Sequence, residues 1–278
     1  MIKNILVGVD GSDHARTATR YAQWFAKRFD ARVLGLHVID IVSVEGPFFH
    51  DISGSLGFEP YLDFTSKVRD ALAERGKVIL EEFQASCAKE GVRSDVALQF
   101  GIVPSEICER AREADLVVIG HRGVNQRFST GLLGGVAESV SRQCNEPVLL
   151  TPQEFADVRS PLLAYDGSER ASLAMHFAGE VCSKLDLPLE VLTVERDRDV
   201  GEQTIAEARR HLEPYKLRLE ARIVDGHAAE RIPAEVKERG HDLVFMGSHG
   251  HGRILELVLG STTEYVLRNV TCPVLLHR

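Results

Sequence analysis

The sequence has little positive charge and no long apolar run. Its 33 lysines and arginines are outnumbered by 41 aspartates and glutamates, which leaves a net charge of −8 at pH 7. Nucleic acids and anionic membranes attract basic surfaces, so we expect neither as a partner. No apolar stretch approaches the roughly 20 residues that a helix needs to cross a bilayer. The composition therefore favours a soluble globular protein.

Cysteine is also sparse. The five cysteines are odd in number, lie far apart and form no CxxC pair. We interpret them as reduced, mostly buried thiols, which is typical of a cytoplasmic protein. The first apolar segment, residues 5–9, is too short for the core of a secretory signal and predicts a β-strand. The cysteines are Cys87, Cys108, Cys144, Cys182 and Cys272.

Common catalytic motifs are absent. The sequence contains no GxSxG, no HExxH, no Walker A sequence and no Cys/His cluster with metal-site spacing. It therefore indicates no catalytic residue and no metal ligand set. His37 and His121 lie near the ends of predicted strands. A zinc or acid–base role is conceivable there, but we interpret both as packed or surface histidines.

The most informative feature that is present is an internal repeat. Residues 5–12 and 161–168 both read as an apolar strand followed by Asp-Gly-Ser, at an offset of 156 residues. The helix that follows repeats the same apolar spacing at the same offset, which predicts the same buried helix face in both halves. Its members are Ala15, Ala18, Ala22, Phe25 and Phe29 in the first half, and Ala171, Ala174, Ala178, Val181 and Leu185 in the second.

The repeat predicts two tandem domains. A length of 278 residues suits two domains of ordinary size, and we place them at residues 1–152 and 153–278. Strands alternate with helices in each half, which predicts a doubly wound α/β domain with a mostly parallel five-stranded sheet. The halves differ most at residues 40–64, where the first carries an insertion that we interpret as a surface loop or a functional flap.

A candidate phosphate site lies in the second half. In open α/β sheets, ligands bind beyond the carboxyl ends of the strands where the strand order reverses. Asp166 ends the first strand of this half, and Gly247, Gly250, Gly260 and Ser261 follow its fourth strand in the pattern G-x2-G-x9-G-S. Glycine amides, a hydroxyl and a helix N-terminus favour phosphate oxygens.

This arrangement resembles the adenine-nucleotide-binding branch of the universal stress protein family. The resemblance implies that ATP or AMP binds in the second domain, with Mg²⁺ as an open addition. Asp166 and the backbone near Val194 are then expected to hold adenine or ribose, and Met246 to line the pocket. The phosphates are expected at Gly247, Gly250, Gly260, Ser261 and Thr262. His249, His251 and Arg253 are phosphate candidates only by position; the alternative is a solvated loop.

The first half departs from this pattern. Ten residues, not nine, separate Gly123 from Gly134, and Gly135 stands where serine or threonine is expected. We therefore expect a reset loop and a degenerate site. Its residues are Asp10, Val38, Gly120, Gly123, Gly134 and Gly135, with Arg122 and Arg127 as further anion candidates.

The two Asp-Gly-Ser turns have a structural explanation as well. Ser12 and Ser168 are suited to cap the helices that follow them. Capping accounts for the serines, whereas we expect only a ligand to account for Asp10 and Asp166.

Three functions stay open at this point. The first is a regulatory stress-response protein whose nucleotide occupancy changes its choice of a protein partner. The second is a slow ATP hydrolase, although neither a water-positioning base nor an SGGxDS loop is present. The third is an interaction scaffold without nucleotide.

The family resemblance also implies a strand order of 3-2-1-4-5 in each domain and pairing through the last strands. Residues 148–150 and 274–276 should therefore join in a pseudo-twofold intramolecular dimer. Further homodimerisation stays open.

Overall fold

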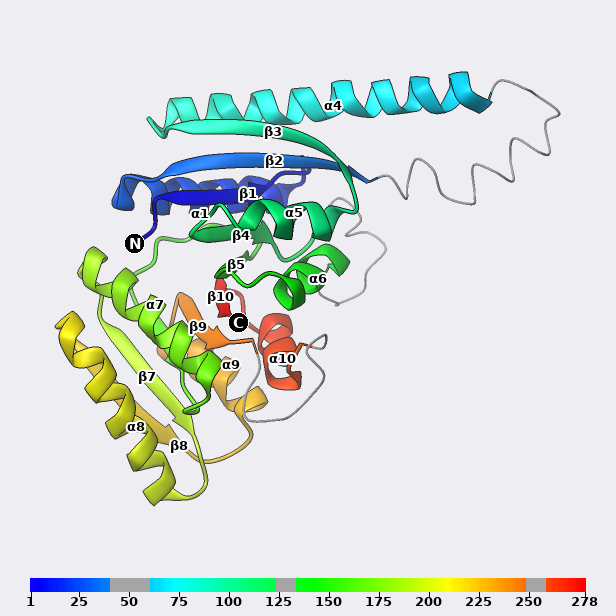
Figure 1. Cartoon of the computed structure of the whole chain (residues 1–278). Coiled ribbons are helices and arrows are strands. Elements are labelled where there is room, and N and C mark those ends of the chain that lie inside the picture. Colours follow the sequence, from blue (N-terminus) through cyan, green and yellow to red (C-terminus); the bar gives the residue numbers. More distant parts are fainter. Residues whose placement is uncertain (41–60, 124–133, 249–258) are drawn as a thin grey trace.

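The two halves contain the same series of elements (Figure 1). The computed structural model describes residues 1–40, 61–123, 134–248 and 259–278. The first half contains β1 (Asn4–Gly8), α1 (Asp13–Phe29), β2 (Arg32–Asp40), α4 (Tyr61–Lys89), β3 (Ser94–Gly101), α5 (Val103–Ala111), β4 (Leu116–Gly120), α6 (Gly135–Gln143) and β5 (Val148–Thr151). The second half contains β6 (Pro161–Ala164), α7 (Glu169–Leu185), β7 (Leu189–Val194), α8 (Arg198–Leu212), the 3₁₀ turn η2 (Glu213–Tyr215), β8 (Leu219–Val224), α9 (Ala228–Arg239), β9 (Leu243–Gly247), α10 (Ser261–Asn269) and β10 (Val274–His277).

All ten strands form one sheet. Its order is β3-β2-β1-β4-β5-β10-β9-β6-β7-β8, so each half has the predicted order 3-2-1-4-5. Neighbouring strands are parallel within each half, whereas β5 and β10 pair antiparallel. Leu149 lies opposite Leu275, its own equivalent in the repeat. A pseudo-twofold axis therefore passes through this pair, and the predicted intramolecular dimer is confirmed.

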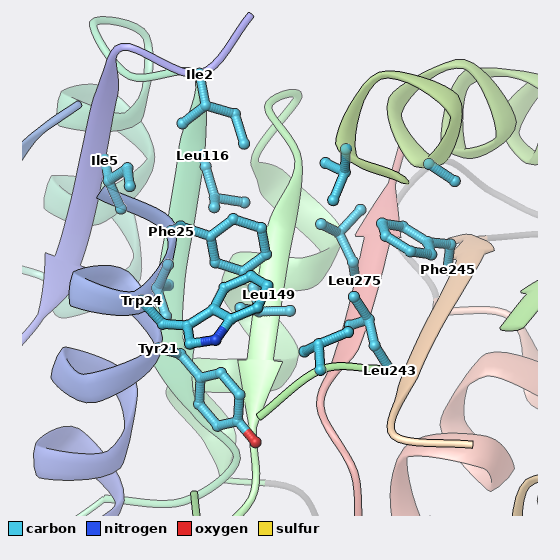
Figure 2. Close-up of a cluster of buried hydrophobic side chains, with 14 of the residues drawn as sticks. Ile2, Ile5, Tyr21, Trp24, Phe25, Leu116, Leu149, Leu243, Phe245 and Leu275 are labelled. Atoms are coloured by element: carbon cyan, nitrogen blue, oxygen red, sulfur yellow. The ribbon is translucent and has the colours of Figure 1, made fainter. Parts of the chain in front are cut away.

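Each face of the sheet carries one apolar core that crosses the junction between the halves. On the face covered by α1, α4, α7 and α8, the core includes Phe25 and Leu149 of the first half together with Phe245 and Leu275 of the second. Figure 2 shows these side chains gathered in one cluster. The opposite face, under α5, α6, α9 and α10, joins both halves in the same way. The described residues contain no helix long and apolar enough to span a membrane.

The segment that joins the halves is bound to α1. Phe155 packs on the ring of Tyr21 with ring centroids 4.7 Å apart, and the amide of Ala156 donates to the Tyr21 hydroxyl at 3.1 Å. The indole of Trp24 donates to the Asp157 carboxylate at 2.9 Å. The chain that leads from β5 to β6 is thereby held against the first half.

The insertion is shorter than expected at its carboxyl end. We expected loop through residue 64, but α4 begins at Tyr61, the residue after Pro60 in the sequence. Proline fits the start of a helix because it has no amide proton to leave unpaired. Residues 41–60 of the insertion lie outside the described residues.

The expectation of reduced cysteines is wrong for one pair. Cys108 on α5 and Cys144 at the end of α6 form a disulfide, with Cα atoms 5.0 Å apart. Sequence spacing did not suggest this pair because the two residues are 36 positions apart and meet only when the helices pack. Cys87, Cys182 and Cys272 are free and buried, as expected.

The pairing of Leu149 with Leu275 is open to a direct test. Both side chains are fully buried, so each leucine-to-alanine change should lower the free energy of unfolding by roughly 2–5 kcal/mol. Because the two residues are cross-strand neighbours, the double variant should differ from the sum of the single variants by at least about 0.5 kcal/mol. Urea titration measures all three values.

The exposed Leu173→Ala provides the control, with an expected change within about 0.5 kcal/mol. Strict additivity of the two core changes would contradict the contact across the junction.

Candidate functional site

The first half contains a cleft at the carboxyl ends of β1, β2 and β4. The cavity measures about 810 Å³ and lies at the position where the strand order reverses between β1 and β4. All six residues that the sequence indicated for the degenerate site line it. They are Asp10, Val38, Gly120, Gly123, Gly134 and Gly135.

Three helices form the remaining walls, and of these sequence reasoning had assigned only the first residue of α6, Gly135, to the site. The long helix α4 contributes Leu72, Arg75 and Ile79, while α5 and α6 contribute residues such as Ile107 and Val136. The spacing of Leu72, Arg75 and Ile79 places them on one face of α4. That spacing is a signal that sequence reasoning could have used. The cleft is therefore mostly apolar, with Asp10, Asp40, His37, Arg75 and Arg122 as its ionisable lining.

The aspartates at the strand ends have a structural role. A carboxylate oxygen of Asp10 accepts a hydrogen bond from the amide of Ser12 at 2.9 Å, and Asp166 accepts one from Ser168 at 3.0 Å. These Asx turns correct the expectation that only a ligand accounts for the aspartates. The serines cap as predicted, because Ser12 accepts from the amide of Ala15 at 3.1 Å and Ser168 from that of Ala171 at 3.3 Å.

The glycines that end β4 and β9 are required by close helix packing. A Cβ on Gly120 would lie 2.6 Å from the Cβ of His14, and one on Gly247 would lie 2.8 Å from the amide nitrogen of Ala171. Gly123 has a different neighbour, since a Cβ there would lie 2.6 Å from a carboxylate oxygen of Asp10. The backbone at Gly123 thus passes directly over the strand-end carboxylate.

The closing glycines of the two loops occupy equivalent places. Gly134 has φ −63° and ψ 139°, and Gly260 has φ −59° and ψ 140°. The amide of Gly134 donates to the carbonyl of His121 at 2.9 Å, and that of Gly260 to the carbonyl of Ser248 at 3.2 Å. The expected change in loop conformation is therefore absent at Gly134. The additional residue falls within 124–133, outside the described residues.

The chemical difference between the halves lies in the next residue. Gly135 and Ser261 are the first residues of α6 and α10, and neither helix has a side-chain cap. Ser261 is exposed and Thr262 half-buried, so two hydroxyls stand at the N-terminus of α10. Thr263, by contrast, is buried and donates to the carbonyl of Ser248 at 3.1 Å.

The other residues expected in the second site lie just beyond β6, at the end of β7 and on β9. Asp166 is exposed, Val194 is half-buried at the end of β7, and Met246 is buried in the core beneath α9 and α10. Their predicted roles toward a nucleotide stay predictions. Four of the remaining candidates, Gly250, His249, His251 and Arg253, lie outside the described residues, as does Arg127 in the first half.

The two singled-out histidines lie in different places. His37 lines the cleft, and its Nδ1 lies 2.7 Å from the carbonyl oxygen of Val9, so Nδ1 carries the proton and donates. His121 instead lines a separate hollow with Glu154 of the joining segment and Arg268 of α10. His121 thus lies between two residues of the first cleft, Gly120 and Arg122, but is not itself among the residues that line it.

Burial, together with smaller effects of the neighbouring His14 and Arg122, lowers the pKa of His121 to about 4. Its imidazole is therefore neutral near pH 7. Within the described ranges, no three His, Cys, Asp or Glu side chains are placed to hold a metal ion together.

Fold and site together define a tandem doubly wound α/β protein with a cleft at a switch point. The sequence profile described as the Universal stress protein family matches residues 1–152 and again residues 159–278. The chain therefore belongs to the universal stress protein family, in its tandem two-domain form.

Individual relatives agree over the full length. A universal stress protein of Synechocystis sp. is 32% identical over 288 residues, with all of both chains covered. One from Mycobacterium tuberculosis is 26% identical over 99% of this chain and 94% of its own length. The crystal structure of a universal stress protein from Archaeoglobus fulgidus superposes with a TM-score of 0.76 at 23% identity, covering 99% and 96% of the two chains. That structure supports the fold.

The pKa of His121 predicts a specific acid sensitivity. An unfolded histidine binds a proton below about pH 6.5, whereas His121 in the folded protein resists protonation down to about pH 4. The contribution of His121 to the free energy of unfolding is therefore fully present above pH 6.5. It is lost as the pH falls from 6.5 toward 4, by at most about 3 kcal/mol. His121→Gln should narrow the stability difference between pH 7 and pH 4.5.

Urea unfolding of both proteins at the two pH values measures this effect. Using the difference between variant and wild type removes the contributions of the other titrating groups. If variant and wild type differ in free energy of unfolding by the same amount at pH 7 and at pH 4.5, a neutral, buried His121 is contradicted.

Proposed function

We propose that this chain is a cytoplasmic regulatory protein that holds an adenine nucleotide, ATP or AMP, in its second domain. The nucleotide's phosphates lie at the N-terminus of α10, near Gly247, Gly260, Ser261 and Thr262, with adenine or ribose near Asp166 and Val194. Occupancy then alters the chain's affinity for a protein partner. Neither nucleic acid nor membrane is part of this proposal.

The observation that carries the proposal is the match between the two switch points. Asp166, Gly247 and Gly260 occupy the places that Asp10, Gly120 and Gly134 occupy in the first half, with equivalent hydrogen bonds. In the first half these places line a cavity of about 810 Å³, which lies in the usual size range of ligand pockets. The second half adds two hydroxyls at an uncapped helix N-terminus, where anions are favoured.

A second candidate function is ligand binding in the first cleft. The cavity itself favours it, since its apolar walls suit a flat ring and Arg75 and Arg122 supply positive charge. Gly135 offers no hydroxyl at the N-terminus of α6, so a ligand with fewer phosphate contacts suits this cleft better than a triphosphate.

Two other classes of function are separated from these by simple observations. A slow hydrolase requires Mg²⁺-dependent turnover that is lost in Asp166→Ala. An interaction scaffold requires that no adenine nucleotide binds at all. Asp166 already accepts the amide of Ser168, so the aspartate needs no catalytic role to explain its presence.

The nucleotide site is tested by Ser261→Glu. A carboxylate about 4 Å from a phosphate costs several kcal/mol at an effective dielectric constant near 20, which exceeds a tenfold loss of affinity. Freshly purified protein is denatured, and the released small molecules are quantified by mass spectrometry. Wild type should release about one adenine nucleotide per chain, and Ser261→Glu should release almost none.

Gly135→Glu is the matched control. It places the same charge at the equivalent first residue of α6, where a Cβ meets no atom within 4 Å. An acidic residue in a first helical turn is compatible with folding, so both variants should fold. Retention of nucleotide in Gly135→Glu supports the second-domain site. Loss of nucleotide in Gly135→Glu alone would show that the nucleotide binds in the first cleft instead. Absence of nucleotide from wild type, even after addition of ATP and Mg²⁺, would refute the proposal.

A further inference from the structure

The disulfide Cys108–Cys144 joins two helices that form one wall of the first cleft. Cys108 lies on α5, which contributes Val103, Pro104 and Ile107 to the lining, and Cys144 ends α6, which contributes residues 135–137. The bond therefore fixes the carboxyl end of α6, while the amino end of the same helix faces the cavity.

Besides the disulfide, α6 is held by apolar packing against α5 and β5. Ile107 and Ala111 of α5 and Ala137 and Val140 of α6 are buried in the same core cluster. Each helix has only nine residues. Short helices depend on tertiary contacts for their stability. A covalent bond between them thus has a large effect on how firmly the wall is held.

The second domain has no equivalent bond. Counted from the first helical residues Val103 and Ala228, Cys108 corresponds to Pro233. Cys144 corresponds to Val270, since both are the residues that end the last helix of their half. The sulfur pair is therefore a feature of the first cleft and not of the shared scaffold.

The pair is also distinct from the chain's other cysteines. Cys87, Cys182 and Cys272 are buried, and burial raises the pKa of all three thiols, to about 12 for Cys182 and Cys272. Such thiols hardly form the thiolate that exchanges with disulfides. Cys108 is half-buried whereas Cys144 is almost fully buried, so Cys108 is the more accessible residue of the pair.

We propose that Cys108 and Cys144 form a reversible redox site whose disulfide locks the α5–α6 wall of the first cleft and thereby raises the affinity of that cleft for its ligand. Reduction proceeds by thiol–disulfide exchange. The thiolate of a low-molecular-weight thiol attacks the Cys108 sulfur, the S–S bond breaks, and Cys144 leaves as a thiolate that takes up a proton. A second thiol then releases Cys108 as a thiol and forms a low-molecular-weight disulfide, which is the oxidant of the reverse reaction.

The redox step is tested on the full-length chain in glutathione buffers of graded reduced-to-oxidised ratio. Free thiols are alkylated and counted by peptide mass spectrometry. Cys108 and Cys144 should change together by two alkylations, while the other three cysteines keep a constant state. A pair that stays fully reduced, or fully oxidised, throughout the series would overturn the reversible site.

The lock is tested by hydrogen exchange of the same samples. Reduction should speed the exchange of amides in α6 at least tenfold, and Cys144→Val, which introduces the residue found at this place in the second half, should show the fast rate in every buffer. Amides of α9 and α10 should not respond. The variant Cys182→Ala, whose residue lies in the core on the opposite face of the sheet, should show the same exchange in α6 as wild type. Equal exchange in α6 before and after reduction would overturn the lock.

The effect on affinity rests on the second candidate function, ligand binding in the first cleft. In a Ser261→Glu background, which removes binding at the second site, trinitrophenyl-AMP is titrated by fluorescence against oxidised and reduced protein. Reduction should weaken binding about fivefold, and Cys144→Val should bind equally weakly in both buffers. Equal affinity in both states overturns the coupling to ligand. Absence of binding in both states overturns the ligand function of the cleft. The thiol counts and the hydrogen exchange then test the reversible disulfide and its effect on α6 independently.

Discussion

The antiparallel pairing of β5 with β10 is the constraint on which the molecule depends. Each half alone would end in an apolar edge strand with unpaired backbone groups, and such edges invite aggregation. Joining the two edges produces one ten-stranded sheet, and a core that crosses the junction on each face. Because Leu149 pairs with its own equivalent, Leu275, the halves are related by a pseudo-twofold axis. The parallel strands of one half therefore run opposite to those of the other half. Their carboxyl ends point in opposite directions, and the two switch points are kept apart.

This arrangement lets the scaffold stay constant while the chemistry of the two sites differs. Asp115 accepts from the amides of Lys3 and Asn4, and Asp242 accepts in the same way from Arg159 and Ser160. These contacts hold β1 and β6 in the same setting. Among the described residues, the halves differ around the two switch points in the length of α4 against α8, in Gly135 against Ser261, and in the Cys108–Cys144 bond. Under the proposed function, these differences suit the second half to phosphate oxygens and the first half to a more apolar ligand.

Much of the fold could be predicted from the sequence, and the site only in part. Strand order and helix faces follow from local periodicity, which is why the face of α1 from Ala15 to Phe29 is buried as expected. The six first-half candidates share one cavity because each of them lies at or beyond a strand end or at a helix N-terminus, where topology decides position. The rest depends on contacts between segments distant in sequence. Arg75 enters the cleft because α4 lies over β2 and β3, Cys108 meets Cys144 across two helices, and His121 turns to the other half.

The central claim is that both halves share one cooperative sheet. Native-state hydrogen exchange, followed amide by amide on β5 and β10 at increasing urea concentrations, tests it most directly. The account predicts that amides of both strands exchange only through global unfolding, with one free energy equal to that from urea titration. Exchange of one half's strand amides at a clearly lower free energy, while the other half stays protected, would show two independent domains and contradict the account.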